Sequence, residues 1–251
     1  MNPAKRPVTM PTAAERLIIA LDFDRVDTAR EIVRDLSGRV GVFKVGLQLY
    51  TAAGPSFVRE IVESGAKVFL DLKFHDIPNT VSKAGIEAAR LGVWMFNIHA
   101  SGGREMMQRT VEEVSAVCEA ENLRRPKIIA VTVLTSSDAN TLRETGIEHS
   151  VENQVLNLAK LAVGSGLDGV VASAREASAV RAAMSGPGFL IVTPGVRPEF
   201  ATNDDQRRVM TPAAALSAGS DYLVVGRPVT QAADRRAAVE QICQEMESAL
   251  Y

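Results

Sequence analysis

The chain has 251 residues, of which 46% are hydrophobic and 23% are charged, and its formal net charge at pH 7 is −2. These values are ordinary for a globular protein, and the length suits one large α/β domain. The charge provides no basic field for nucleic acid or an anionic membrane. Two cysteines, Cys118 and Cys243, exclude a disulfide framework and a cysteine-based zinc site. With no apolar run long enough to cross a bilayer, we expect a cytoplasmic protein.

The N-terminal residues 1–14 are rich in Pro, Thr and Ala and lack the apolar core of a secretory signal. We expect them to form an extension, either flexible or packed as a short segment. A single catalytic domain is expected over residues 15–251, because no linker or low-complexity stretch divides that part of the chain.

Short β-like runs alternate with longer segments of helical apolar spacing through the rest of the chain. The expected strands are Leu17–Leu21, Val40–Val45, Lys67–Leu72, Val93–Ile98, Lys127–Val133, Gly169–Ala172, Phe189–Val192 and Tyr222–Val225. The expected helices are Thr28–Leu36, Ser56–Ser64, Ser82–Leu91, Glu105–Glu121, Gln154–Val163, Arg175–Met184, Pro212–Ala218 and Val229–Leu250.

Eight nearly continuous apolar strands, each followed by a helix, predict a parallel sheet that is buried on both faces. Eight such repeats in one domain of this length favour a closed (β/α)8 TIM barrel. A doubly wound open sheet is the alternative, because periodicity does not show whether a sheet closes. The longest expected loop runs from Pro194 to about Arg208, and loops of this length are often functional.

The run Asp71–Thr80 is the most informative stretch of the sequence, because it places two carboxylates and an ammonium within six residues. Asp71 and Lys73 are two apart on an expected strand and therefore face the same way. Asp76 lies beyond that strand, where Pro78 is suited to begin a helix. Charged residues are rarely buried unless they are paired. The cluster therefore indicates a site at the end of the strand.

Lys44 lies inside another apolar strand, where an unpaired ammonium is costly. Its charge either reaches the surface along the aliphatic stem or pairs with the carboxylates of the next strand. The second reading gives a network of alternating charges from Lys44, Asp71, Lys73 and Asp76. Such a network keeps the lysines charged, so that they can stabilise a developing carbanion and donate a proton. The carboxylates argue against a Schiff-base lysine, which needs a lowered pKa.

Barrel enzymes carry their chemistry at the C-terminal ends of the strands. Polar or turn-forming residues follow nearly every expected strand: Asp22, Lys44, Asp71, Lys73, Asn97, His99, Thr135, Ser136, Pro194, Arg197, Gly226 and Arg227. The last two loops each combine a glycine with an arginine, at the usual phosphate-binding place of a barrel. The alternative for Gly226-Arg227 is a simple turn with a surface arginine. The three histidines have no metal-ligand spacing, so we predict no metal site.

The run from Asp71 to Val81 closely resembles the central motif of the orotidine 5′-phosphate decarboxylase family. The resemblance extends from about Leu17 onward, through Leu21-Asp22, Phe43–Gly46, Val133–Ser136, Thr193–Arg197 and Val225–Pro228. It implies a barrel of the bacterial, single-function type that converts orotidine 5′-monophosphate to UMP and CO₂. This is the last step of de novo pyrimidine synthesis, and the resemblance implies no metal or organic cofactor.

Carried over residue by residue, the resemblance makes Lys73 the proton donor to C6, within the charge network. It places Asp76, Ile77 and Thr80 in the site of a neighbouring subunit, which implies a homodimer with shared active sites. The other implied substrate contacts are Asp22 and Lys44 to the ribose, Thr135 and Ser136 to the pyrimidine, and Gln206, Gly226 and Arg227 to the phosphate, with Pro194 and Arg197 close by.

Two other functions stay open. One is a magnesium-dependent sugar-phosphate lyase or decarboxylase of the same barrel superfamily. Lys44, where that enzyme would have a metal ligand, and the continuation Pro78-Asn79-Thr80 argue against it. The other is a non-catalytic barrel that binds phosphoribosyl compounds for regulation, which would bind nucleotide without turnover.

Overall fold

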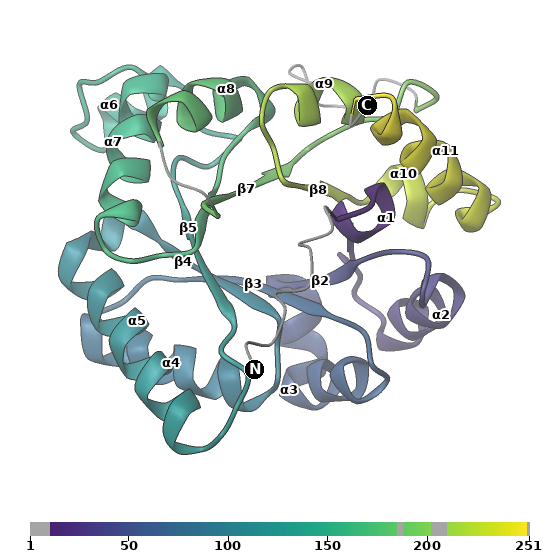
Figure 1. The fold of residues 1–251 in the computed structure, drawn as a ribbon, viewed down its shortest axis with the longest axis horizontal. Helices are drawn as coiled ribbons and strands as arrows, with labels where there is room; N and C mark the ends of the chain where they lie inside the picture. Colours follow the sequence, from purple (N-terminus) through teal and green to yellow (C-terminus); the bar gives the residue numbers. More distant parts are fainter. Residues whose placement is uncertain (1–10, 185–187, 202–209, 250–251) are drawn as a thin grey trace, which may run out of the picture.

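The computed structural model describes residues 11–184, 188–201 and 210–249. Within these residues, eight parallel strands pair in sequence order and close into one barrel, with the helices outside it (Figure 1). The strands are β1 (Leu17–Ala20), β2 (Val42–Gly46), β3 (Val68–Phe74), β4 (Met95–His99), β5 (Lys127–Val131), β6 (Gly169–Val171), β7 (Leu190–Pro194) and β8 (Tyr222–Val225). The predicted TIM barrel is confirmed, and β1 pairs with β8, which excludes the open sheet.

The longer helices are α2 (Val26–Leu36), α3 (Leu47–Glu63), α4 (Pro78–Arg90), α5 (Gly103–Ala120), α7 (Val151–Val163), α8 (Ala174–Ala183) and α11 (Arg235–Glu247). The shorter ones are α1 (Ala13–Arg16), the 3-10 helix η1 (Ala100–Gly102), α6 (Ala139–Glu144), α9 (Pro212–Ser217) and α10 (Arg227–Thr230). No helix in this described part of the chain is long and apolar enough to cross a membrane.

The main differences from the predicted helices have local reasons. The predicted helix Val229–Leu250 is two helices, because the Asp234 carboxylate accepts two backbone N–H groups at 3.0 Å and starts α11 anew. The helix α3 begins earlier than predicted and bends at Gly54, where φ is +66° before Pro55. The unpredicted helix α6 is capped by Asp138, but its sequence is too short and polar to show apolar periodicity.

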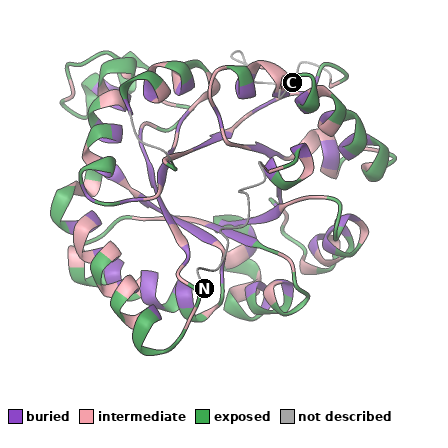
Figure 2. Cartoon of the chain, in the orientation of Figure 1, coloured by how far each residue is buried: buried purple, intermediate pink, exposed green. Residues whose placement is uncertain are grey.

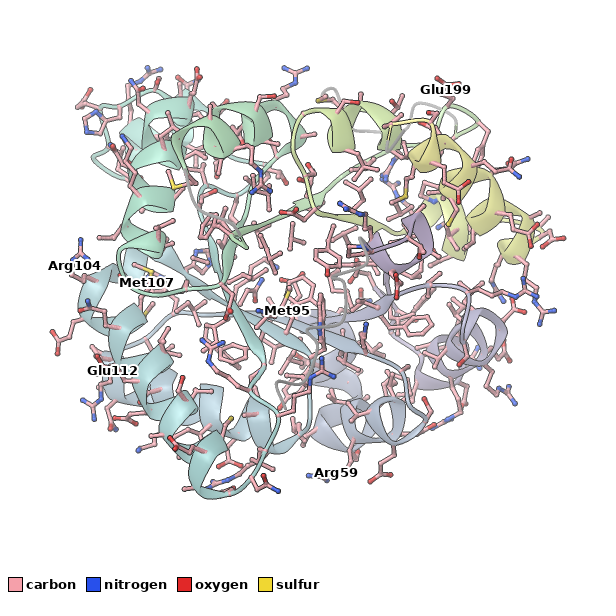
Figure 3. All side chains as sticks on the ribbon, viewed as in Figure 1. Arg59, Met95, Arg104, Met107, Glu112 and Glu199 are labelled. Atoms are coloured by element: carbon pink, nitrogen blue, oxygen red, sulfur yellow. The ribbon has the colours of Figure 1, made fainter. Side chains whose placement is uncertain are left out.

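The apolar interior of the barrel determines which side chains reach its mouth. The inward-facing core consists of Ile18, Ala20, Val42, Phe69, Met95, Ile129, Val192 and Val224. The strands are largely buried while the helices expose their outer faces (Figure 2), and Met95 lies inside the ring of strands (Figure 3). Because side chains alternate along a strand, the residue two positions after the last core residue of a strand also faces inward. These residues, such as Lys44 after Val42 and Asp71 after Phe69, lie at the C-terminal mouth of the barrel.

The described part of the predicted N-terminal extension packs against the barrel. Ala13 is 1% exposed, and the Gly41 N–H donates to the Ala14 carbonyl at 2.7 Å. A Cβ on Gly41 would lie 2.2 Å from the Glu15 carbonyl oxygen, so only glycine allows this approach. Residues 1–10 lie outside the described residues, and the domain boundary stays a prediction.

Candidate active site

Lys44 is a buried lysine that is held by two carboxylates. It lies two residues after the inward-facing Val42 of β2. Its Nζ is 2.9 Å from Asp22 Oδ1 and 3.3 Å from Asp71 Oδ2, and its side chain is only 9% exposed. The alternative of a surface-directed lysine is therefore excluded.

The two carboxylates also decide the protonation state of Lys44. Burial by itself lowers the pKa of this ammonium, but the charges of Asp71 and Asp22 outweigh it and raise the pKa above its ordinary value. Lys44 is thus charged at neutral pH. A charged lysine can stabilise negative charge on a ligand, whereas formation of a Schiff base needs the neutral amine.

Lys73 faces the same carboxylate from β3. Its Nζ donates to Asp71 Oδ1 at 2.7 Å, and its side chain is 30% exposed. Its backbone has φ +52°, a left-handed conformation that costs a non-glycine residue about 1–3 kcal/mol. Regular strand alternation correctly predicted that Lys73 lies beside Asp71, but it did not predict the left-handed backbone conformation of Lys73. The strand β3 also continues beyond its expected end at Leu72, to Phe74.

Asn97 of β4 joins these two residues. Its Nδ2 donates to Asp71 Oδ1 at 2.7 Å, and its Oδ1 accepts from the Lys73 backbone N–H at 2.8 Å. The sequence placed Asn97 among the polar residues at strand ends but predicted no role for it. Its position two residues after the inward-facing Met95 is the signal that predicts its direction.

Asp76, Ile77 and Thr80 lie outside this cluster. All three are exposed, and Ile77 is 66% exposed. Asp76 Oδ1 accepts from the backbone N–H of Ile77 at 2.6 Å. None of the ion pairs among the described residues links Asp76 to Lys44 or Lys73. Within one chain, the charge network therefore holds Lys44, Asp71 and Lys73, with Asp22 in place of Asp76.

Two adjoining cavities open at this mouth. The larger, about 500 Å³, brings together most of the predicted site residues: Asp22, Lys44, Asp71, Lys73, Thr135, Pro194, Arg197, Gly226 and Arg227. The smaller, about 170 Å³, shares the two lysines and Asp71 and is otherwise largely apolar, with Phe69, Val131, Val133, Leu134, Thr135, Val171, Val192, Pro194 and Val224. An apolar pocket with a few convergent polar groups is typical of a small-molecule site.

Besides Asp76, Ile77 and Thr80, two further predicted residues are not among the described residues that line these cavities. Ser136 lines a third cavity of about 420 Å³, which shares Thr135 and Pro194 with the others. Gln206 lies outside the described residues, so the structure gives no geometry for it.

His75 and His99 lie next to each other beside the charged cluster. The His99 and His75 rings lie 5.2 Å apart between centroids. Burial, and after it the charges of His75 and Lys73, lower the pKa of His99, so its imidazole is neutral at pH 7. No group of three or more His, Cys, Asp or Glu side chains in the described ranges is arranged to hold a metal ion.

Comparison with known proteins identifies the family of this barrel. The family model described as orotidine 5′-phosphate decarboxylase / HUMPS matches residues 15–242. The chain belongs to this family. The resemblance found in the sequence is therefore confirmed, and with it the expectation of an enzyme of the decarboxylase family.

Relatives in this family match nearly the whole chain. The orotidine 5′-phosphate decarboxylase of Syntrophotalea carbinolica is 56% identical over 95% of this chain and 97% of its own. The orotidine 5′-phosphate decarboxylase of Geobacter sulfurreducens is also 56% identical, over 95% of this chain and 99% of its own. The solved orotidine 5′-phosphate decarboxylase from Lactobacillus acidophilus has a TM-score of 0.80 and 39% identity, with 92% of this chain and 98% of that chain covered.

Proposed function

We propose that this chain decarboxylates orotidine 5′-monophosphate to UMP and CO₂, the last step of de novo pyrimidine synthesis, without a metal or organic cofactor. One observation carries the proposal: the Asp71 carboxylate lies between two ammonium groups, 3.3 Å from Lys44 and 2.7 Å from Lys73. All three groups line a cavity of about 500 Å³. The relatives named orotidine 5′-phosphate decarboxylase, at 56% identity, support the choice of substrate.

The charged cluster suits the chemistry of this reaction. Loss of CO₂ leaves a carbanion at C6 that has little resonance stabilisation, so fixed positive charge must stabilise it. The Lys73 ammonium supplies that charge and then donates its proton to C6. Asp71 faces the substrate carboxylate, and repulsion between the two favours loss of CO₂. Lys44, which stays charged, remains paired with Asp71 at 3.3 Å in this role.

The other contacts follow the lining of the cavities. Asp22 and Lys44 bind the ribose hydroxyls, and Thr135 and Ser136 bind the pyrimidine. The phosphate is bound after the seventh and eighth strands, by Gln206, Gly226 and Arg227 with Pro194 and Arg197 beside them. The presence of Asp22, Thr135 and Arg227 along one cavity supports this orientation of the nucleotide.

The functional unit in this proposal is a homodimer with shared active sites. Asp76, Ile77 and Thr80 contribute to the site of the partner subunit. The exposure of all three residues, with 66% of Ile77 accessible, supports this role.

A cytoplasmic location stays part of the proposal. It is supported by Cys118 and Cys243, which are both free thiols in the structure.

The test of the proposed activity is the change in ultraviolet absorbance when the purified protein is mixed with orotidine 5′-monophosphate, with and without EDTA. We expect turnover that chelation does not change. Turnover abolished by EDTA would favour the magnesium-dependent alternative. Binding of UMP without any turnover would instead favour the non-catalytic barrel.

A further inference from the structure

The strands β3 and β4 lose their register beside the charged cluster. Pairing shifts between the pairs Leu70–Phe96 and Phe74–Ile98, so residues 71–73 lie opposite Asn97 alone. A bulge of this kind leaves backbone groups without their ladder partners and turns side chains in new directions. The bulge therefore sets the direction of Lys73.

Lys73 has the least usual backbone in the bulge. Apart from glycines, only Lys73 and Asn122 have a positive φ among the described residues, and asparagine tolerates this conformation far better than lysine. The Lys73 N–H has left the strand ladder and donates to Asn97 Oδ1 at 2.8 Å. Because an N–H without an acceptor is costly in the interior, this bond stabilises the left-handed conformation.

The other end of the Asn97 amide restrains the carboxylate. Asn97 Nδ2 donates at 2.7 Å to Asp71 Oδ1, the same oxygen that accepts from Lys73 Nζ at 2.7 Å. Asp71 Oδ2 is 3.3 Å from Lys44 Nζ. Both oxygens of Asp71 are thus engaged, and the carboxylate cannot rotate without breaking one of these contacts.

Asn97 is buried beneath the surface of the mouth. It is 1% exposed, and it lines neither of the two cavities that hold the lysines. Both polar atoms of its amide are already engaged with Lys73 and Asp71. Any effect of Asn97 on the reaction passes through Lys73 and Asp71.

We propose that Asn97 is a positioning residue for the decarboxylation: its one amide holds Lys73 in the left-handed conformation and fixes the orientation of Asp71. The inference rests on the proposed function. Because ribose and phosphate are bound on other strands, loss of the amide lowers kcat and leaves nucleotide affinity nearly unchanged. A residue that only stabilised the fold would change the amount of active protein and not its kcat.

The first experiment compares Asn97→Leu with Thr110→Val in the full-length protein. Leucine has the same branched shape as asparagine but makes neither hydrogen bond. Thr110→Val also removes a buried polar contact, the 2.7 Å bond to the Met106 carbonyl within α5, at a side chain that lines neither of the two charged cavities. For Asn97→Leu we expect kcat to fall about 100-fold, a typical effect of misplacing a catalytic group, with little change in KM or in UMP affinity. Thr110→Val should retain the kcat of the unchanged protein.

The second experiment uses Asn97→Asp, which keeps the acceptor for the Lys73 N–H and replaces the donor to Asp71 by an oxygen. The introduced carboxylate repels Asp71 when ionised and donates a hydrogen bond when protonated. The ratio of its kcat to that of the unchanged protein should therefore rise as the pH falls. This pH dependence would not arise from a change in fold stability alone.

The outcomes separate the two proposals. If the unchanged protein has no turnover, the proposed function fails. If it turns over and folded, UMP-binding Asn97→Leu retains its kcat, the positioning role is wrong. If Asn97→Leu does not fold, Asn97→Asp decides, and a kcat ratio that is flat with pH would overturn the inference.

Discussion

Asp71 is the residue on which the site depends, because two lysines and one amide all converge on its carboxylate. Its neighbour Lys44 is buried, and an ammonium in that position is tolerated only because it is paired. In the proposed reaction, this arrangement keeps positive charge fixed beside the carbon at which negative charge develops. Fixed charge of this kind needs no reorganisation during the reaction.

Replacing Lys73 by alanine tests the centre of the proposed chemistry. Lys73→Ala should lower kcat by about 1,000-fold or more, because it removes both the proton donor and the charge beside C6. Binding of UMP, measured by calorimetry, should be largely retained. Lys160→Ala, at an exposed lysine of α7, is the matched control and should have normal kinetics. Near-normal turnover of Lys73→Ala would contradict the proton-donor role.

At the scale of elements, the helices α4 and α5 are joined by a charged cluster. The Glu113 carboxylate of α5 accepts from Lys83 at 2.9 Å, Ser82 at 2.9 Å and Arg109 at 2.7 Å. Hydrogen bonds from Lys83, Arg109 and Ser82, in that order, lower the pKa of Glu113 from 4.5 to about 2. The helix α4 begins at Pro78, two residues after Asp76, and contains Thr80, so this contact also anchors the segment proposed to reach the partner subunit.

The stability of the α4–α5 contact should depend on pH. Because the pKa of Glu113 is lower in the folded state, its stabilisation is complete above the ordinary value of 4.5 and is lost as the pH falls toward 2. Glu113→Gln should therefore lower the free energy of unfolding at pH 7 by about 1 kcal/mol, since its side chain is 26% exposed and partly screened.

Urea unfolding at pH 7 and at pH 3 measures this difference. The difference in free energy of unfolding between Glu113→Gln and the unchanged protein should be smaller at pH 3 than at pH 7. Glu112→Gln, at the neighbouring exposed residue at the edge of the molecule (Figure 3), should show no such gap. If this difference for Glu113→Gln is equal at both pH values, the ionised Glu113 carboxylate does not stabilise the α4–α5 contact.

At the scale of the whole molecule, the proposed dimer makes each site depend on two chains. In this proposal, Lys73 and Asp71 serve the barrel that carries them, whereas Asp76 serves the partner. One short segment, Asp71–Thr80, would then supply groups to two sites. In a symmetric dimer, both sites exchange the same residues.

Co-expression of two inactive variants tests this sharing. Lys73→Ala and Asp76→Ala chains should form mixed dimers in which one site carries both changes and the other carries neither. If the two chains assemble at random, half of the dimers are mixed. Each mixed dimer has one intact site out of two, so roughly a quarter of normal activity should return.

The control for this experiment is co-expression of Lys73→Ala with Asp71→Ala. Both changes fall in the site of their own barrel, so every site keeps one defect and no activity should return. If co-expressed Lys73→Ala and Asp76→Ala chains are no more active than either variant alone, the active sites are not shared.

The sequence by itself determined the main order of strands and helices and which polar residues follow the strands. Both depend on local patterns: near-continuous apolar strands predict burial on both faces, and alternation along one strand predicts that Asp71 and Lys73 face the same way. The motif Asp71–Val81 was specific enough to identify the family. These features are readable because they repeat over short distances along the chain.

Only the tertiary structure decided how the sheet closes and how the charged residues meet. The contacts of Asn97 join residues 24 and 26 positions apart, across a bulge that no local pattern predicts. The left-handed backbone of Lys73 depends on that contact, since lysine alone disfavours it. A register shift between two strands is a property of the pair, and therefore it cannot be read from either strand alone.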